Sequence, residues 1–407
     1  MKWLFIHQNF PAQYVHAARR LAEAGDEVVF ITQQHERQLP GVRKIVYAPA
    51  RPSSPIHPFA ADFNLAVQNG VSVVQICEDL KREGFTPDLV AGHNGWGEIL
   101  YVKDCWPATP LLGYFEFFYR PSGSDLDFDP EFPPSAADRM RVRTRNAVNL
   151  LGLETADWGQ TPTGFQRDLY PESYRRRIGV VHEGIDTALV QPEPSARLWL
   201  AGGLSLSRDD PVITYSTRNL EPYRGFHVLM RALPILLERH PSARVLIAGG
   251  NDVSYGRRPT QAASWREQLV AELGDRLDMS RVHFLGRMNY QQYLAMLQIS
   301  AAHIYLTYPF VLSWGLLEAM AAGCAVVASR TPPVEEVIRD GENGYLVDFF
   351  DGAALADRVG DLLNHPDRHE DVRVAARRTV VERYDLAGVC LPAYLTLLRR
   401  LIRRQRG

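Results

Sequence analysis

The chain has 407 residues, of which 46% are hydrophobic and 23% are charged, and its formal net charge at pH 7 is −2. This length exceeds what one ordinary core accommodates, so we expect two domains of roughly 200 residues each. The near-zero net charge argues against nucleic acid as a partner, and no apolar stretch approaches the ~20 residues of a membrane-spanning helix.

Cysteine usage and the first residues indicate the compartment. Cys77, Cys105, Cys324 and Cys390 stand far apart, without the spacing of metal ligands. That is typical of buried thiols in a reducing compartment. The N-terminal run MKWLFIHQNF has the length of a strand and lacks the longer apolar core of a signal peptide. We therefore expect a cytoplasmic protein.

The first third of the chain reads as alternating strands and helices. Residues 3–7 form a predicted strand, residues 10–24 a helix and residues 27–32 a second strand. This pattern predicts a doubly wound α/β domain, in which ligands bind at the carboxyl ends of the strands. The loop from His7 to Gln13 is therefore a candidate ligand-binding segment.

Two later predicted strands of this domain end in polar side chains. Residues 88–93 end at His93, and Glu116 stands near the end of residues 110–118. A carboxylate within an aromatic run is costly unless it is paired or lines a cleft. For both side chains the alternatives are a place in a binding cleft and a satisfied buried polar group.

Residues 120–134 are rich in Pro, Gly, Ser and Asp without hydrophobic periodicity, which predicts a long loop. Asp125, Asp127 and Asp129 stand at alternate positions there, but an EF-hand also requires a glycine and a distal glutamate that are absent. We expect an exposed acidic loop and no metal site. A group of arginines follows in a predicted helix and suits either solvent or an anionic acceptor: Arg139, Arg141, Arg143 and Arg145.

The second half repeats the alternation after a polar, proline-containing segment, residues 191–211, that reads as a linker. Its first predicted strands are residues 212–215, 244–250 and 281–286. The turn after the first of these strands holds two cations, Arg218 and Arg224. Either these arginines pair with surface acids or they face an anionic ligand.

Residues 304–329 form the most regular part of the sequence. A buried strand leads into a helix with an apolar face, Gly323 is placed to cap that helix, and residues 325–328 form the next buried strand. A right-handed crossover makes the two strands parallel. One charge stands in this apolar unit, Glu318, in the first turns of the helix.

The sequence LLEAMAAG at residues 316–323, followed by an apolar strand, resembles the donor-site signature of glycosyltransferase family 4. Its members are retaining enzymes of the GT-B fold that take sugars from nucleotide diphosphates. The resemblance implies that Glu318 holds the ribose. It also implies that the turn before the helix, with Ser313, Trp314 and Gly315, offers backbone N–H groups to the diphosphate, which a helix N-terminus favours physically.

Further matches stand in the same order as in the family. Arg218 matches a diphosphate-binding arginine, and Arg224 stands where the family has a diphosphate-binding lysine. Two cations facing a leaving diphosphate would stabilise the charge that grows as the bond breaks. The resemblance places the nucleobase at the turn of Gly286, Arg287 and Met288, although a bare strand-to-helix turn is the alternative there.

The chain departs from the family at three places. Phe310 stands where the family has a glutamate that contacts the donor sugar. Glu116 stands where many members have a histidine that touches the reacting sugar. The loop after the first strand lacks the family's frequent glycine pair, so we expect Asn9, Phe10 and Gln13 to contact the acceptor rather than a phosphate.

The resemblance implies two Rossmann-like domains facing a cleft. We expect residues 1–195 to bind the acceptor and residues 196–385 to bind the nucleotide sugar. The last residues, 386–407, would form a helix that crosses back to the first domain and a basic tail. The catalytic candidates are Glu116, His93, Arg218 and Arg224.

The implied reaction is metal-independent, retaining transfer from a nucleotide-diphosphate sugar to a hydroxyl of a glycan, a lipid-linked or a small-molecule acceptor, with no cofactor. A nucleotide-sugar epimerase of the same fold and an inactive GT-B subunit, for which Phe310 is the best argument, are the alternatives. The basic tail reads either as an exposed end or as a peripheral contact with the inner face of an anionic membrane: Arg399, Arg400, Arg403, Arg404 and Arg406.

Overall fold

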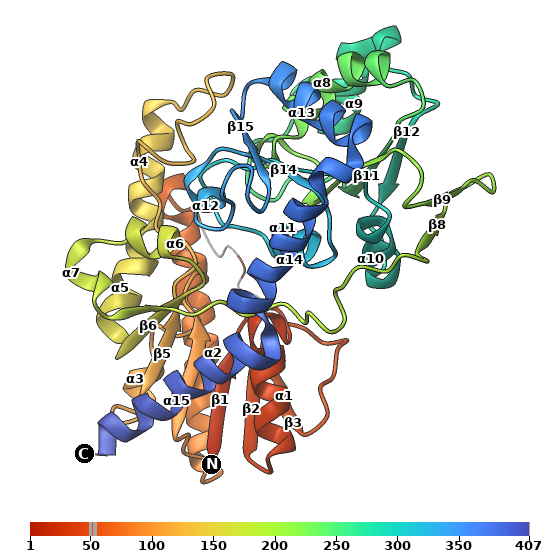
Figure 1. The fold of residues 1–407 in the computed structure, drawn as a ribbon. Coiled ribbons are helices and arrows are strands. Elements are labelled where there is room, and N and C mark those ends of the chain that lie inside the picture. The colour runs from red at the N-terminus through yellow and green to blue at the C-terminus, as the bar shows by residue number, and fades with distance from the viewer. Residues whose placement is uncertain (49–50, 52–54, 407) are drawn as a thin grey trace. The chain divides into compact units, whose positions relative to one another are not determined.

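The computed structural model describes residues 1–48, 51 and 55–406, which form two compact units (Figure 1). Unit 1 comprises Met1–Gly184 and Ala387–Gly407, and unit 2 comprises Ile185–Leu386. The units therefore divide before the predicted boundary at residue 195. In the part of the chain that the structure describes, no helix combines the length and hydrophobicity of a membrane span.

Unit 1 is built on a seven-stranded parallel sheet with the strand order β3-β2-β1-β4-β5-β6-β7. Such an order is that of a doubly wound α/β domain, as predicted. The strands are β1 (Lys2–Ile6), β2 (Glu27–Thr32), β3 (Val42–Val46), β4 (Leu89–His93), β5 (Leu111–Tyr114), β6 (Trp158–Thr161) and β7 (Ile178–Val180).

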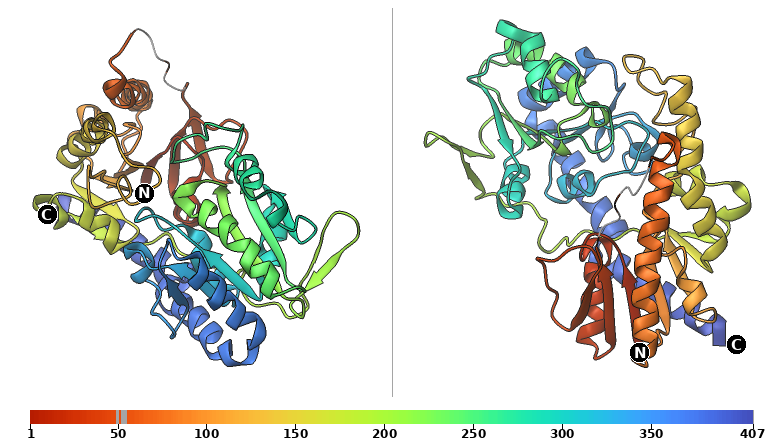
Figure 2. Two further views of the ribbon diagram at one scale, coloured as in Figure 1. Left: turned by 90° about the horizontal axis from the view of Figure 1, so that it is seen from above. Right: turned by 180° about the vertical axis from the view of Figure 1, so that it is seen from behind.

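Helices cover both faces of this sheet, which explains why its central strands are apolar throughout. In β1, Trp3 and Phe5 face α1 and α15, while Leu4 and Ile6 face α2, because successive side chains point to opposite faces. The long α2 runs along its face of the sheet in the right view of Figure 2. The helices are α1 (Val15–Glu23), α2 (Ala61–Arg82), α3 (Val102–Cys105), α4 (Ala136–Arg145), α5 (Ala147–Thr155), α6 (Gly164–Leu169), α7 (Glu172–Arg175) and α15 (Leu391–Arg406).

The first helix begins later than predicted. A 3-10 turn covers Ala12–Tyr14, and α1 starts only at Val15. Ala12 has φ 47°, a left-handed conformation that a right-handed α-helix cannot contain. The prediction of a helix from residue 10 was wrong for this reason, and Phe10 and Gln13 stand before α1.

The C-terminal helix α15 returns to unit 1, as predicted, and lies against the sheet in Figure 1. Leu398, Leu401 and Ile402 form its buried face. The opposite face carries exposed arginines, namely Arg399, Arg400, Arg403 and Arg404. The side chain of Arg406 lies outside the described part of the structure.

Unit 2 is built on a six-stranded parallel sheet with the order β12-β11-β10-β13-β14-β15. Its strands are β10 (Val212–Asn219), β11 (Arg244–Gly250), β12 (Val282–Gly286), β13 (Ala302–Tyr305), β14 (Val326–Ser329) and β15 (Tyr345–Val347). Its helices are α8 (Phe226–Arg239), α9 (Trp265–Leu273), α10 (Tyr290–Gln298), α11 (Trp314–Ala321), α12 (Pro332–Glu335), α13 (Gly352–Asn364) and α14 (Glu370–Tyr384).

The segment predicted as a linker is an antiparallel hairpin of unit 2. It pairs β8 (Arg197–Trp199) with β9 (Ser205–Ser207). Leu198 and Leu206 are 5% and 2% exposed and belong to the core of unit 2. The linker prediction was therefore wrong. Each of these three-residue strands has one central leucine that points to the core, while its two neighbours point to the other face.

The β13–α11–β14 unit has the predicted form. Gly323 follows α11 with φ 81°. Its backbone N–H donates to the carbonyl oxygen of Met320 over 3.2 Å, and that of Cys324 donates to Ala319 over 3.0 Å. This pair of bonds is a Schellman motif, which requires the left-handed residue that glycine supplies without strain.

Candidate active site

Unit 2 gathers the predicted donor-site residues at the carboxyl edge of its sheet. Arg218 lies near the end of β10, Arg224 ends the 3-10 turn Pro222–Arg224 that follows this strand, and Gly286 is the last residue of β12. Glu318 lies in α11, which follows β13. Since these strands are parallel, their carboxyl ends meet along one edge, where open α/β sheets bind ligands.

Arg224 is buried, and the buried carboxylate of Glu221, three residues earlier, acts on its charge without forming an ion pair. One terminal nitrogen of Arg224 donates to the hydroxyl of Thr307 and to the carbonyl oxygen of Val311, both over 2.9 Å. The rings of Tyr255 and Phe310 lie 5.4 and 5.9 Å from its guanidinium carbon. Among the described residues no carboxylate forms an ion pair with it. A buried cation without a directly paired carboxylate is expensive, so an anionic ligand would complete this site.

The residue after Arg224 must be a glycine. Gly225 has φ 70°, and a Cβ atom there would lie 2.2 Å from the Cβ of Leu306. The turn therefore packs directly against the chain that leaves β13. This close approach fixes the position of the backbone that carries the Arg224 side chain.

The second predicted arginine, Arg218, is exposed. Within residues 1–48, 51 and 55–406 it makes no ion pair, so the alternative of pairing with a surface acid is not realised. Arg287 differs, because its guanidinium lies 3.5 Å from the carboxylate of Asp252 and 3.4 Å from the side-chain oxygen of Asn219. Met288 packs partly buried against the core of unit 2.

Glu318 has a hydrogen-bond donor on each carboxylate oxygen. The hydroxyl of Tyr290 donates to one oxygen over 2.8 Å, and that of Tyr293 donates to the other over 3.0 Å. Burial raises the pKa of Glu318, and the two tyrosine hydrogen bonds lower it in part. The tyrosines thus fix the orientation of a half-buried carboxylate.

Helix α11 begins without a capping hydrogen bond from the side chain of its N-cap residue. Ser313 is the extended N-cap residue, yet its hydroxyl makes no capping bond. Its own N–H donates to the hydroxyl of Tyr305 over 3.0 Å. Trp314 is 42% exposed, and Gly315 follows it. An uncapped helix start presents donors and a positive dipole end to an anion.

Phe310 lies in an aromatic cluster of unit 2 and is 4% exposed. Its ring centroid lies 4.8 Å from that of Tyr255 and 5.5 Å from that of Tyr223. The side chain therefore packs where the family pattern has a hydrogen-bonding carboxylate. At this position of the carboxyl edge of the sheet, Phe310 provides an apolar ring and no hydrogen-bond acceptor.

Unit 1 brings together His7, His93 and Glu116 at the carboxyl edge of its own sheet. The rings of His7 and His93 lie 5.0 Å apart, and Nε2 of His93 lies 3.9 Å from a carboxylate oxygen of Glu116. The indole of Trp96 stacks on His93 with a centroid distance of 4.1 Å. The two predicted catalytic candidates of this unit are therefore neighbours.

Local backbone bonds fix the tautomers of both histidines. The N–H of Asn9 donates to Nδ1 of His7 over 2.8 Å, and that of Gly95 donates to Nδ1 of His93 over 3.0 Å. Burial lowers the pKa of His7 to about 3 and that of His93 well below its ordinary value. Both imidazoles are therefore neutral and present Nε2–H as a donor.

The predicted acceptor residues divide into two kinds. Asn9 is exposed and Gln13 is half-buried, so both side chains can reach a ligand. Phe10 is 2% exposed, and its ring packs 4.8 Å from that of Phe30 in the core of unit 1. The structure gives Phe10 a packing role, because its ring is enclosed by the sheet.

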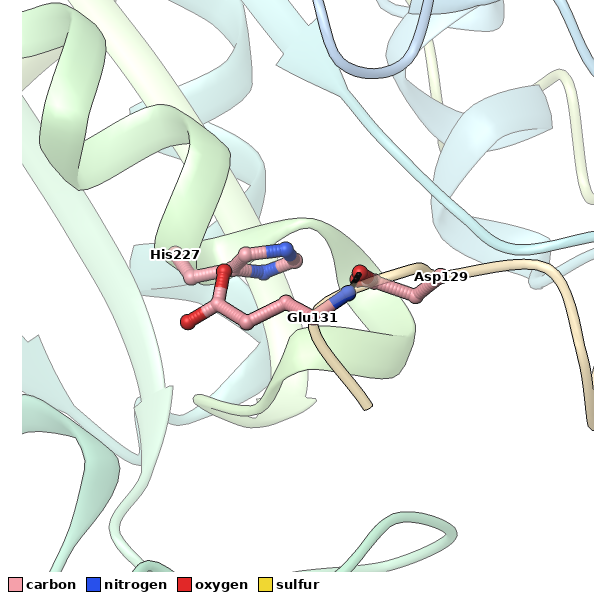
Figure 3. Close-up of side chains that lie close together, drawn as sticks. All are labelled: Asp129, Glu131 and His227. Atoms are coloured by element: carbon pink, nitrogen blue, oxygen red, sulfur yellow. Dashed lines mark hydrogen bonds between the residues drawn. The ribbon is translucent and has the colours of Figure 1, made fainter. Parts of the chain in front are cut away.

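The aspartates of the acidic loop accept hydrogen bonds from other groups of the same loop. Asp125 accepts from the hydroxyl of Ser124 over 2.9 Å, and Asp127 accepts from the N–H of Gly123 over 3.1 Å. Asp129 accepts from the N–H of Glu131 over 2.9 Å (Figure 3). Asp125 and Asp129 are 5% and 3% exposed, so the prediction of an exposed loop was wrong for those two.

Comparison with known proteins agrees with this geometry. The profile described as "Glycosyl transferase family 4 group" matches residues 24–190, and "Glycosyl transferases group 1" matches residues 204–379. The D-inositol 3-phosphate glycosyltransferase of Corynebacterium efficiens is 33% identical over 324 residues, which cover 75% of this chain and 69% of that protein. The chain belongs to glycosyltransferase family 4.

Solved structures place this glycosyltransferase in the GT-B fold. The sucrose-phosphate synthase of Thermosynechococcus elongatus superposes with a TM-score of 0.73 at 19% identity, covering 99% of this chain and 100% of that one. The Anabaena protein HepE in complex with UDP-glucose gives a TM-score of 0.68 at 16% identity, covering 98% and 99%.

Sequence reasoning missed several groups that position the predicted donor-site residues of this glycosyltransferase. Glu221 is 1% exposed, and its carboxylate accepts backbone N–H groups of Ser254, Tyr255 and Gly256 over 2.9–3.1 Å. It thereby holds Tyr255 beside Arg224. An acidic residue before a proline gives no signal for this role, whereas Tyr290 and Tyr293, three positions apart on one helix face, could have been noticed.

Proposed function

We propose that this glycosyltransferase moves a sugar, with retention at the anomeric carbon, from a nucleotide-diphosphate sugar to an acceptor hydroxyl. The acceptor is a glycan, a lipid-linked or a small molecule. The observation that carries the proposal is the buried Arg224, which lacks a carboxylate partner among the described residues. HepE, a protein of the same fold, was solved in complex with UDP-glucose, which supports a nucleotide-sugar donor.

Each donor-site residue then has a distinct role. Arg218 and Arg224 bind the diphosphate and stabilise its charge as it leaves. The uncapped start of α11 adds backbone donors. Glu318 accepts hydrogen bonds from the ribose hydroxyls, and the turn at Gly286 binds the base through backbone groups. In this proposal the cations do the work of a divalent ion, so transfer needs neither a metal nor a cofactor.

In unit 1, Glu116 and His93 are the catalytic candidates, and Asn9 and Gln13 contact the acceptor. Neutral His93 donates through Nε2–H and brings no positive charge to the site. Glu116, which is about one-third exposed, accepts from hydroxyl groups of the reacting sugar or the acceptor. The pair therefore orients hydroxyl groups by one donor and one acceptor.

Product analysis tests this proposal against its two alternatives. A thermal-shift panel of nucleotide sugars first identifies the donor, since a ligand at 100 times its dissociation constant adds about 2.7 kcal/mol of stability. The protein is then incubated with that donor and a mixture of acceptors. A new glycoside whose anomeric configuration matches the donor supports the proposal. A changed nucleotide sugar without a glycoside indicates the epimerase, and binding without turnover indicates the inactive subunit.

We also propose a cytoplasmic location with peripheral contact at the inner face of a membrane. The exposed arginines of α15 support an electrostatic contact with anionic lipid. Co-sedimentation with anionic and with neutral vesicles tests the contact. Equal recovery with both kinds of vesicle contradicts it.

A further inference from the structure

Two helices of unit 2, α10 and α11, are joined by a hydrogen bond that holds an exposed aromatic ring in place. Tyr290 is the first residue of α10 and is 47% exposed, whereas Leu294, Met296 and Leu297 of the same helix are buried. The hydroxyl of Tyr290 donates to one carboxylate oxygen of Glu318 in α11 over 2.8 Å. Single exposed aromatic side chains are common on protein surfaces. This ring is unusual because its far end is bonded to a half-buried carboxylate, so it cannot turn freely in water.

The backbone end of the Tyr290 side chain is fixed as well. Asn289 is the N-cap residue of α10, and its side chain accepts the N–H of Gln292 over 2.9 Å. This cap makes Tyr290 the first helical residue after the turn that begins at Gly286, which has φ 64°. The side chain therefore starts directly after that turn and ends on Glu318. A ring held at both ends loses little conformational freedom when a ligand binds to it.

Tyr293 does not present a comparable surface. Its hydroxyl bonds to the other oxygen of Glu318 over 3.0 Å, and its ring packs against the core of unit 2. The centroids of the two tyrosine rings lie 6.0 Å apart. Burial and the nearby charge of Glu318 raise the pKa of both phenols, so both keep their protons and continue to donate. Both tyrosines thus orient the carboxylate, and of the two Tyr290 offers more of its ring to a ligand.

We propose that the ring of Tyr290 is the surface on which the nucleobase of the donor stacks. This inference rests on the proposed function, which puts the ribose at Glu318 and the base at the turn of Gly286. Base and ribose are joined by one bond, and the Tyr290 side chain runs from that turn to that carboxylate. A nucleoside that reaches both points therefore lies along the ring. Stacking on an aromatic side chain adds affinity for any base, because every base has a π face.

Stacking on Tyr290 would also explain how the site selects nucleotide-activated sugars. Arg218 and Arg224 can bind any diphosphate, because charge-assisted hydrogen bonds to phosphate do not depend on a base. A simple sugar phosphate or inorganic pyrophosphate presents the same kind of oxygens to these arginines but has no ring to stack. Tyr290 is thus a specificity-determining residue that separates nucleoside diphosphates from other phosphorylated ligands.

The test compares Tyr290→Phe with Tyr290→Leu in the full chain. Both variants lack the hydroxyl, so any effect that acts through Glu318 is the same in both, and they differ in the π face. Calorimetry measures the affinity for UDP, ADP and GDP, and for inorganic pyrophosphate as a ligand without a base. Trp199→Leu is the control, because it removes another exposed ring of unit 2, in the hairpin of β8 and β9.

We expect the parent to bind at least one of the three nucleoside diphosphates. Loss of a stacking ring to alanine corresponds to about five- to a hundredfold in affinity, and leucine retains part of the contact. Tyr290→Leu should therefore bind this nucleotide roughly three- to thirtyfold more weakly than Tyr290→Phe. The two variants should bind pyrophosphate equally, and Trp199→Leu should match the parent. In NMR spectra the base protons of the bound nucleotide should shift upfield in the parent and in Tyr290→Phe, but not in Tyr290→Leu.

The outcomes separate this inference from the proposed function. Equal nucleotide affinity in Tyr290→Phe and Tyr290→Leu overturns the stacking role and leaves the donor assignment in place. An equal loss of pyrophosphate affinity in Tyr290→Leu also overturns it, because the damage would then be to the site as a whole. A parent that binds none of the three nucleoside diphosphates contradicts the proposed donor, and the stacking role is overturned with it.

Discussion

The phenolic hydroxyl of Tyr293 donates to one carboxylate oxygen of Glu318 over 3.0 Å. This bond lowers the pKa of a carboxylate that burial otherwise raises. In Tyr293→Phe the pKa of Glu318 should therefore rise further, because the ionised carboxylate loses a hydrogen-bond donor. If the ionised carboxylate holds the ribose, nucleoside diphosphate affinity falls as pH falls through that pKa. The fall should begin at higher pH in the variant.

Titration of diphosphate affinity between pH 4 and 8 measures this shift. Glu318→Gln is the control, because it removes the titrating group and should bind weakly at every pH. The same pH midpoint for the parent and Tyr293→Phe would show that Glu318 does not contact the nucleotide.

Replacing either donor-site arginine should weaken diphosphate binding. A hydrogen bond to a charged group contributes ~1.5–3 kcal/mol, so Arg218→Ala and Arg224→Ala should each bind nucleoside diphosphate at least tenfold more weakly. Binding of the nucleoside without phosphate should not change. Calorimetry measures both ligands, and Arg339→Ala is the control because that side chain is 80% exposed on the same unit. Unchanged diphosphate affinity in both variants contradicts the assignment.

Turnover should survive excess chelator. In the proposed mechanism the arginines would supply the charge that a divalent ion supplies in other transferases. The loop carboxylates of Asp125, Asp127 and Asp129 already accept hydrogen bonds from their own loop. The assay compares initial rates with and without a chelator, and after adding magnesium or manganese. A rate that disappears and returns with the metal would make that loop a metal site.

Because of Phe310, we expect the enzyme to prefer a donor sugar that lacks a hydroxyl group, such as a deoxy sugar. The Phe310 ring lies 5.9 Å from the guanidinium carbon of Arg224 and cannot accept a hydrogen bond from a sugar hydroxyl. Apolar sites discriminate by only ~1–3 kcal/mol per methylene, so a deoxy-sugar donor should turn over several-fold to about a hundredfold faster than its hydroxylated counterpart. Phe310→Glu should lose this preference.

The measurement is kcat/KM for both donors in the parent and in Phe310→Glu. A parent that prefers the hydroxylated donor refutes the idea. A parent that turns over neither donor points to the inactive subunit, for which Phe310 is only a packing residue.

Glu98 should make unit 1 less stable as pH rises. It is 0% exposed, accepts from the hydroxyl of Tyr47 over 3.1 Å, and burial raises its pKa from 4.5 to about 7. Below pH 4.5 the group is protonated in both the folded and unfolded states. Between 4.5 and 7 only the unfolded state ionises, so the free energy of unfolding falls by up to about 3 kcal/mol.

Denaturant unfolding of the parent and of Glu98→Gln at pH 4, 6 and 8 tests this sign. The amide cannot ionise, so the variant should gain stability relative to the parent as pH rises. A difference that stays constant across the three pH values means that Glu98 is ionised in the folded protein.

Much of unit 2 was predictable because its signals are local. The apolar periodicity around Glu318, the capping Gly323 and the two arginines Arg218 and Arg224 each depend on a few neighbouring residues. The contacts of Glu318 with Tyr290 and Tyr293 join side chains that are more than twenty positions apart. The spacing of Tyr290 and Tyr293 on one helix face is visible in the sequence, but no pattern in one sequence pairs these tyrosines with Glu318. The positions of the cations were therefore predictable, whereas the groups that orient their neighbours were not.

In unit 1 the prediction was weakest where the backbone departs from regular geometry. The left-handed Ala12 delays the first helix, and Phe10, expected to contact the acceptor, is enclosed by the core. The same limit explains the missed hairpin, whose strands are three residues long. A strand that short gives too few alternations to distinguish it from a polar loop.

The return of α15 to the first sheet decides the order in which the protein can be completed on the ribosome. Unit 2 is one uninterrupted segment, so its strands and helices are all available once Leu386 has been made. Unit 1 is complete only when α15 has been made, because α15 covers part of the sheet face that carries Trp3 and Phe5. A nascent or truncated chain that ends after unit 2 therefore carries an apolar sheet face open to water, and such faces aggregate. Loss of the last helix, although that helix follows unit 2 in sequence, therefore damages unit 1.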